Sequence, residues 1–255
     1  MIIDMHAHLG RSWLGWSPVF FQTASQLNDY YAEFDVDKAC INSFLLAYDP
    51  VAGNNEIAAA VKEFPDRFIG FGVISPRYGT AKDVAAEVDR CVQELGFKGL
   101  KLHPSLNEYF ADSPVVYPVV EKAIQYDIPM LFHCWSDTYS SPRAIAALAD
   151  RYPEAKIIMG HMGGDHWLEA IHIAATHENI YLDTADSHGD LLVMHTAVQV
   201  AGEDKITFGS DVPAFNLPSE LAKVKHAMIG ETAKVKILGG NARRLLNLGG
   251  VTPVE

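Results

Sequence analysis

The run MIIDMHAHLGR, residues 1–11, decides between the two folds that alternating strands and helices can form. Its apolar start predicts a strand over Met1–Met5, which leads directly into a histidine-rich segment. An open, doubly wound sheet often carries a glycine-rich G-x-G-x-x-G phosphate loop after its first strand, and this run has none. The run therefore favours a closed barrel, whose strands deliver functional side chains directly to the barrel mouth.

Outward from this run, short β-prone apolar segments alternate with amphipathic or alanine-rich stretches along the whole chain. The predicted strands are Met1–Met5, Lys38–Phe44, Phe68–Ile74, Gly99–His103, Pro129–His133, Lys156–Gly160, Ile180–Asp183 and Lys205–Phe208. The predicted helices are Ala24–Glu33, Asn55–Glu63, Ala81–Leu95, Pro114–Gln125, Pro142–Arg151, Asp165–Thr176, Gly189–Val200, Pro218–Met228 and a last one near Thr232–Leu246. Eight such units predict an α/β protein with a single, slightly distorted (β/α)₈ TIM barrel and a short extra C-terminal helix.

Length and composition agree with one large domain. The chain has 255 residues, of which 49% are hydrophobic and 20% charged, so it can bury a substantial core. No Ser/Gly-rich linker or charge block divides it, and we expect a single domain over residues 1–255. No apolar run reaches the roughly 18 residues of a membrane helix or forms a signal-peptide core, which predicts a cytoplasmic protein.

The charge and the cysteines narrow the classes of partner. A formal charge of −12 repels phosphate backbones and anionic lipids, so neither nucleic acid nor a membrane is an expected partner. The three cysteines include no C-x-x-C pair, which argues against a disulfide framework or a cysteine-zinc site. We expect a small-molecule substrate, and self-association into a homo-oligomer stays open.

His6 and His8 stand at the end of the first predicted strand. Side chains two apart on a strand point to the same face, so both imidazoles are expected in the barrel mouth, where they could share one cation. Asp4 has the same parity one layer deeper, and it could orient a ligand histidine. A histidine pair of this spacing also occurs by chance, so the pair alone does not define a site.

Further polar residues end later strands. His133 follows an apolar run, His161 precedes two glycines that let a ligand approach the backbone, and Asp211 follows the last predicted strand. Each also has an ordinary structural reading, as a core histidine, a turn histidine or a turn-capping acid. Three or four nitrogen and oxygen ligands with one open position would form a catalytic metal site.

The spacing of these residues strengthens the metal-site interpretation. From His8 to Lys101 is 93 residues, or three units of 31. The next intervals are 32 residues to His133 and 28 to His161. A further 50 residues, or two units, lead to Asp211. Unrelated core residues have no reason to return at one phase of the repeat, so a shared site is favoured.

Four more residues are candidates for substrate contact. Lys101 would hold a substrate carboxylate or, if carbamylated, bridge two metals; an ion pair with a neighbouring acid is the structural alternative. His103 lies nearer the rim, Trp135 would wall the pocket, and Arg11 would bind an anionic group. The aromatic segment Trp13–Phe21 is a candidate lid or oligomer surface that would set substrate choice.

Together these residues resemble the amidohydrolase superfamily, and within it the amidohydrolase-2 branch that includes aminocarboxymuconate-semialdehyde decarboxylase. The matching motifs, in family order, are Asp4–His8, Gly96–Pro104, His133, Gly160–Gly164, Gly209–Asp211 and Leu238–Arg243. The resemblance implies a divalent metal held by His6, His8, His133 and Asp211. It implies that His161 binds a second metal or contacts the reaction centre.

The leading hypothesis for the activity is a metal-dependent hydrolase that cleaves an ester, lactone or amide of a small carboxylate-bearing substrate. Asp211 would serve as base towards a metal-activated water, and His161 would polarise the carbonyl. Zinc is the preferred ion over manganese or iron, with one or two ions per site. The alternative is non-oxidative decarboxylation of an aromatic or enoic acid. A non-catalytic ligand-binding barrel is the third hypothesis.

Overall fold

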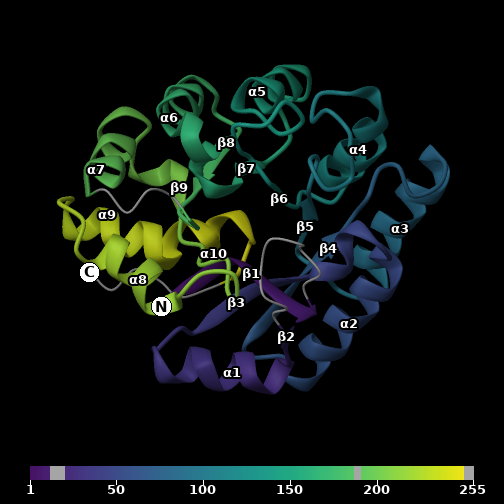
Figure 1. Ribbon diagram of the computed structural model, residues 1–255, viewed down its shortest axis with the longest axis horizontal. Helices are drawn as coiled ribbons and strands as arrows, with labels where there is room; N and C mark the ends of the chain where they lie inside the picture. The colour runs from purple at the N-terminus through teal and green to yellow at the C-terminus, as the bar shows by residue number, and fades with distance from the viewer. Residues whose placement is uncertain (12–20, 187–190, 250–255) are drawn as a thin grey trace.

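The computed structural model describes residues 1–11, 21–186 and 191–249, and it confirms the TIM-barrel prediction (Figure 1). Eight parallel strands curl around the centre with the helices outside them. Their bounds are β1 (Ile3–Arg11), β3 (Lys38–Ser43), β4 (Phe68–Val73), β5 (Gly99–Leu102), β6 (Met130–Phe132), β7 (Ile157–Met159), β8 (Ile180–Asp183) and β9 (Ile206–Thr207). No helix among these described residues is long and apolar enough to cross a membrane.

The barrel closes between its first and last strands. Met5 N donates to Phe208 O and His8 N donates to Val212 O, both at 2.8 Å, and a parallel bridge joins Ala7 to Val212. A short strand, β2 (Phe21–Gln22), pairs antiparallel with the end of β1. The sequence analysis predicted neither β2 nor the extension of β1 to Arg11.

Several helices begin at a side-chain cap. Thr23 and Thr80 form capping boxes for the helices that begin at Ala24 and Ala81, and Ser141 caps the helix that begins at Pro142. The main helices are α1 (Ala24–Glu33), α2 (Pro50–Glu63), α3 (Ala81–Gln93), α4 (Tyr117–Gln125), α5 (Pro142–Arg151), α6 (Trp167–Thr176), α7 (Leu191–Val200) and α8 (Leu217–Lys225).

The predicted C-terminal helix is not one continuous helix. It consists of α9 (Glu231–Val235), a π-helical turn over Lys236–Gly240 and α10 (Asn241–Leu245). Ile237 O accepts a hydrogen bond from Phe208 N at 2.9 Å, which ties the turn to the barrel strand beside it. A side chain at Gly239 would lie 2.3 Å from Met1 O, so this turn packs directly against the start of the chain.

The core has two parts. Most apolar side chains form a large cluster that packs the helices against the outer face of the strands. A smaller cluster contains Ile3, Met5, Phe71 and Leu131, and α10 contributes Leu245 to it. Alternate strand residues thus fill the barrel interior up to the level of Lys101, above which the buried residues become polar.

A register shift between Asp4 and Ala7 changes the alternation along β1. Met5 faces the inner cluster, yet His6, its direct neighbour, faces the barrel mouth, and Ala7 packs in the outer cluster. A bulge of this kind re-aims the side chains that follow it. The predicted parity of His6 and His8 is confirmed, but Asp4 does not share their face.

Candidate metal centre and substrate pocket

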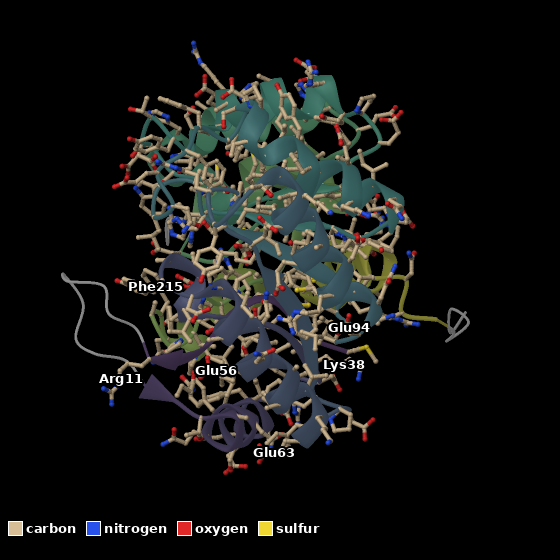
Figure 2. All side chains as sticks on the ribbon, turned by 90° about the vertical axis from the view of Figure 1, so that its right-hand side faces the viewer. Arg11, Lys38, Glu56, Glu63, Glu94 and Phe215 are labelled. Carbon is tan, nitrogen blue, oxygen red and sulfur yellow. The ribbon has the colours of Figure 1, made fainter. Side chains whose placement is uncertain are left out.

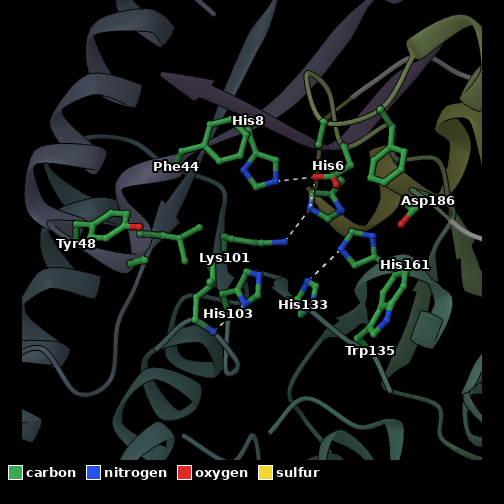
Figure 3. Close-up of a pocket in the computed structure, with 16 residues that line it drawn as sticks. His6, His8, Phe44, Tyr48, Lys101, His103, His133, Trp135, His161 and Asp186 are labelled. Atoms are coloured by element: carbon green, nitrogen blue, oxygen red, sulfur yellow. Dashed lines mark hydrogen bonds and ion pairs between the residues drawn. The ribbon is translucent and has the colours of Figure 1, made fainter. Parts of the chain in front are cut away.

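A cavity of about 360 Å³ lies at the carboxyl ends of the strands and collects most of the residues that the sequence singled out (Figure 3). The predicted residues that line it are His6, His8, Lys101, His103, His133, Trp135, His161 and Asp211. Lining residues that were not predicted are Phe44, Leu46, Ala47, Tyr48, Leu106, Asp186, Ala214 and Phe215. The cavity therefore combines a histidine-rich floor with aromatic and aliphatic walls.

His6, His8 and Asp211 converge as a potential cation site. Each offers one ligand atom, and these atoms lie within 4.8 Å of one another. Asp211 Oδ1 is 2.8 Å from His8 Nε2 and 3.4 Å from His6 Nε2. All three residues are buried, and imidazole nitrogens with a carboxylate oxygen are a donor set that suits zinc, manganese or iron.

Asp183, which the sequence analysis missed, orients His6. Its Oδ2 lies 2.7 Å from His6 Nδ1, so a proton on Nδ1 leaves the lone pair of Nε2 facing the site. Backbone N–H groups of His161 and Ala185 donate to the same carboxylate. Burial raises the pKa of Asp183 to about 8, and these hydrogen bonds oppose that rise. The sequence feature that could have identified Asp183 is its position as an acidic residue at the end of a predicted strand.

Asp4 does not perform the predicted role of orienting a ligand histidine. Its carboxylate accepts hydrogen bonds from Tyr31 Oη at 2.7 Å, from His6 N at 3.0 Å and from both the backbone and the hydroxyl of Ser210. The bulge in β1 turns Asp4 towards α1, away from the cavity. Asp4 instead fastens the first strand to the segment that carries Asp211.

The segment after β9 holds Asp211 in an unusual backbone conformation. Asp211 has φ of 55°, in the left-handed region, and its N–H donates to His6 O at 2.7 Å. This bond sets the carboxylate directly against the two histidines of β1. Hydrogen bonds from His8 keep the pKa of Asp211 below its usual value although burial opposes this.

His8 is held from two sides. Its ring stacks on Phe44, with centroids 4.5 Å apart and 11° between the planes. Asn42 is the register partner of His8 on β3; its side-chain N–H donates to Ala7 O at 2.9 Å. The amide of Asn42 also favours the protonated imidazole, whereas burial lowers the pKa of His8 overall.

Lys101 reaches from β5 to the centre of the site (Figure 3). Its Nζ is 2.8 Å from His6 Nε2, and the side chain is only 1% exposed. Burial lowers the pKa of Lys101 to about 8, while Asp211 and Asp183 act in the opposite direction. Lys101 is therefore not a surface residue, and among the described residues its ammonium makes no direct ion pair. It is a cation at the floor of the cavity.

A group of four aromatic side chains lies beside the potential cation site of His6, His8 and Asp211, which we call the triad. The members of this group are His103, His133, Trp135 and His161. The rings of His103 and His133 stack at 3.8 Å, and His133 Nδ1 is 3.1 Å from His161 Nε2. Trp135 stands edge-to-face with His161 at 5.4 Å. His133 and His161, predicted as ligands, thus lie next to the triad and contact each other. Cys134 is buried in the outer cluster.

The buried histidines that line the cavity are neutral. Burial lowers the pKa of His6, His103 and His133 well below the usual value, and that of His161 to about 4. Neutral imidazoles offer the lone pairs that a metal ion needs. The chemistry of the donor set, together with the carboxylate that orients His6, therefore fits a divalent cation.

Arg11 is not among the described residues that line the cavity, and its role in substrate binding stays a prediction. It is exposed at the end of β1, where the strand pairs with β2 beyond the barrel mouth. Figure 2 shows its side chain at the edge of the molecule, directed outward. Most of the predicted aromatic segment, residues 12–20, lies outside the described residues.

Comparisons with known proteins agree over most of the chain. A family model described as Amidohydrolase matches residues 3–248. A gamma-resorcylate decarboxylase from Polaromonas sp. is 26% identical over 247 residues, covering 76% of this chain and 75% of that protein. The 2-amino-3-carboxymuconate-6-semialdehyde decarboxylase of Dictyostelium discoideum is 28% identical over 240 residues, covering 76% of this chain and 65% of that protein.

Solved structures share the fold. A dihydroxybenzoic acid decarboxylase from Polaromonas sp. with bound manganese and the inhibitor 2-nitroresorcinol has a TM-score of 0.79 at 20% identity, covering 98% of both chains. A 5-carboxyvanillate decarboxylase from Novosphingobium aromaticivorans with bound manganese has a TM-score of 0.77 at 17% identity, covering 97% of both chains.

These comparisons correct two expectations. Hydrolysis of an ester, lactone or amide is wrong as the leading activity, because the relatives named above are decarboxylases, which supports the alternative. A divalent metal is supported, but zinc as the preferred ion is not confirmed, because the related structures named above hold manganese. The sequence patterns that argued for hydrolysis describe the metal site, which both reactions would use.

Proposed function

Since this chain belongs to the amidohydrolase family, we propose that it is a metal-dependent decarboxylase of a small aromatic or enoic carboxylic acid. The observation that carries the proposal is the position of Lys101, a buried cation in contact with His6 at the histidine-rich floor of a cavity with aromatic and aliphatic walls. Such a floor suits the carboxylate of a substrate, and the aromatic walls suit a flat carbon skeleton.

His6, His8 and Asp211 would hold the divalent ion, with His133 as the next candidate ligand and His161 either as a ligand or as a proton-transfer group. The ion would supply electrostatic stabilisation for negative charge on a substrate oxygen. One or two ions, and manganese, zinc or iron, are compatible with these residues. The manganese in the solved relatives makes Mn²⁺ the first ion to test.

In the proposed reaction the bond between the carboxylate carbon and its neighbouring carbon breaks. Carbon dioxide leaves, the electron pair stays on the substrate carbon, and that carbon takes up one proton. Lys101 would orient the carboxylate, and Trp135 would pack against the substrate skeleton. His103, stacked on His133 nearer the cavity rim, would contact the far side of the substrate.

His161 and Asp211 are the proposed proton-transfer residues. His161 Nδ1 is 3.1 Å from Ala185 O, so with its proton on Nδ1 the ring presents Nε2 towards the cavity and His133. Asp211 provides the carboxylate of the proposed metal site, 2.8 Å from His8 Nε2. The proton that the carbon takes up would come from solvent: Asp211 or His161 Nε2 would accept it first and then pass it to the carbon.

Carbon dioxide release from a panel of hydroxybenzoates and unsaturated acids by manganese-loaded protein tests the proposal. We expect one or more acids to yield stoichiometric CO₂ and the protonated product. Asp211→Asn should reduce the rate by about 10²–10⁴-fold, as the loss of a proton-transfer group does. The exposed Asp66 provides the matched control, and Asp66→Asn should keep full activity. No CO₂ from any acid with metal-loaded protein would reject the proposal.

A further inference from the structure

We propose that Lys101 couples the binding of the metal to the binding of a carboxylate, so that each strengthens the other. The inference rests on the proposed function, because it needs a metal held by His6 and Asp211 and a carboxylate ligand. It adds a property that the proposed activity does not require: a metal affinity that the protein holds low until an anion arrives.

The contact between Lys101 and His6 is the first step of the argument. Lys101 Nζ donates to His6 Nε2 at 2.8 Å. Asp183 fixes the other nitrogen of that ring, so Nε2 is the atom that a metal would use. Lys101 therefore occupies the lone pair that a metal needs, and metal binding must break this hydrogen bond.

The second step is that the protein encloses the charged ammonium group of Lys101. The side chain is 1% exposed, so the ammonium cannot move into water without leaving the barrel interior. Two positive ions this close in a medium of low polarity repel each other strongly. Asp211 offsets part of that charge, but the same carboxylate would be a ligand of the metal.

The third step is that an anion in the cavity is the missing partner. Lys101 is the only lysine or arginine that lines the cavity among the described residues. The remaining residues, 12–20, 187–190 and 250–255, contain no lysine or arginine in their sequence. A carboxylate between Lys101 and the metal would satisfy both charges, and by thermodynamic reciprocity the metal would raise carboxylate affinity by the same factor.

Equilibrium dialysis of Mn²⁺ against the full-length protein, with and without saturating benzoate, measures the coupling without turnover. Benzamide serves as the uncharged control ligand. For the wild type we expect benzoate to lower the dissociation constant of Mn²⁺ by about tenfold, within the usual range of coupling between sites, and benzamide to leave it unchanged.

The variant Lys101→Met removes the charge and keeps the length of the side chain. We expect it to bind Mn²⁺ more tightly than the wild type without benzoate, and to lose most of the benzoate effect. A damaged fold cannot explain a gain of affinity. Lys101→Gln, which keeps a donor without the charge, provides a second variant. Lys98→Met, at the exposed residue just before the same strand, changes the net charge equally and should behave as wild type.

Several outcomes would overturn the inference. These are the absence of a benzoate effect in the wild type, an equal effect in wild type and Lys101→Met, or weaker Mn²⁺ binding by both Lys101 variants. These results would leave the proposed decarboxylase intact, because CO₂ release is measured separately. Conversely, coupling observed in a protein that releases no CO₂ would reject only the proposed reaction. A wild type that binds no metal would reject both.

Discussion

At the scale of single residues, the site depends on partners that stand behind the proposed ligands. Asp183 contacts His6 from outside the cavity, and Asn42 holds the backbone of Ala7 between the two histidines of β1. Asp4 fastens the segment that carries Asp211 through Ser210. Such partners choose which ring nitrogen faces the ion and hold it there. Sequence periodicity selects the proposed ligands because they share a phase, but it cannot identify partners that reach them from other strands.

Asp183→Asn tests this dependence. The amide can no longer favour a protonated Nδ1 on His6 as the carboxylate does, so the lone pair of Nε2 becomes less available. We expect Mn²⁺ affinity to fall by about 10–100-fold, the usual effect of losing such a partner. Equilibrium dialysis measures it, and Asp66→Asn provides an exposed control. Unchanged affinity would remove Asp183 from the site.

At the scale of elements, the turn after β7 shapes the Trp135 wall. Residues His161, Met162, Gly163 and Gly164 all have positive φ, which delays α6 until Trp167 although the sequence predicted a helix from Asp165. A helical periodicity cannot report such a turn, because left-handed conformations depend on tertiary contacts more than on residue type. The two glycines were the only local signal.

Gly164→Ala tests the turn. Gly164 has φ of 56°, and a Cβ there would lie 2.4 Å from the ring of Trp135. We expect the variant to lose about 2–4 kcal/mol of unfolding free energy in urea, from backbone strain plus the displaced ring. Gly202→Ala is matched, because Gly202 has φ of 95° with nothing within 4 Å of its Cβ. Equal losses in both variants would show that Trp135 does not pack on Gly164 in solution.

The helix α8 links the loop after β8 to the barrel wall and gives that loop a pH dependence. Glu220 accepts a hydrogen bond from Asp186 N at 3.2 Å and pairs with Lys223 at 2.5 Å. Burial raises the pKa of Glu220 to about 7. Ionisation of Glu220 therefore disfavours the folded state, so its stabilising contribution is complete below about pH 4.5 and lost as the pH rises through 7.

Urea unfolding between pH 5 and pH 8 checks this expectation. The wild type should lose up to about 3 kcal/mol from Glu220 over this range, and Glu220→Gln should remove that part of the pH dependence. Glu231→Gln is the control, because Glu231 pairs with Lys234 at the same spacing but is exposed. A pH profile that Glu220→Gln leaves unchanged would contradict the assignment.

At the scale of the whole molecule, the alternation of strands and helices was sufficient to predict the barrel. The pairing that closes the barrel could not be predicted from the sequence. The hydrogen bonds between β1 and the segment that follows β9 join residues about 200 positions apart. Local sequence patterns do not show which of these distant residues pair with each other. They also do not separate hydrolysis from decarboxylation, because both reactions would use the ligand pattern that His6 and Asp211 represent.

The same closure predicts that metal binding stabilises the entire fold. His6 and His8 belong to the first strand and Asp211 follows the last, so a bound ion would join both edges of the barrel. Mn²⁺ at 100 times its dissociation constant should add about 2.7 kcal/mol of unfolding free energy. His8→Ala should lose this gain and the exposed His172→Ala should keep it, in urea titrations with Mn²⁺ or EDTA. A gain that persists in His8→Ala would place the ion elsewhere.

The hydrogen bond from Asp211 N to His6 O also has a consequence for biosynthesis. Residues 6 and 211 are separated by 205 positions, so a ribosome releases the first proposed ligands long before the last. A nascent chain then carries histidines with no carboxylate beside them. The complete coordination sphere can assemble only when nearly all of the protein has been synthesised, so metal capture would mark the end of folding.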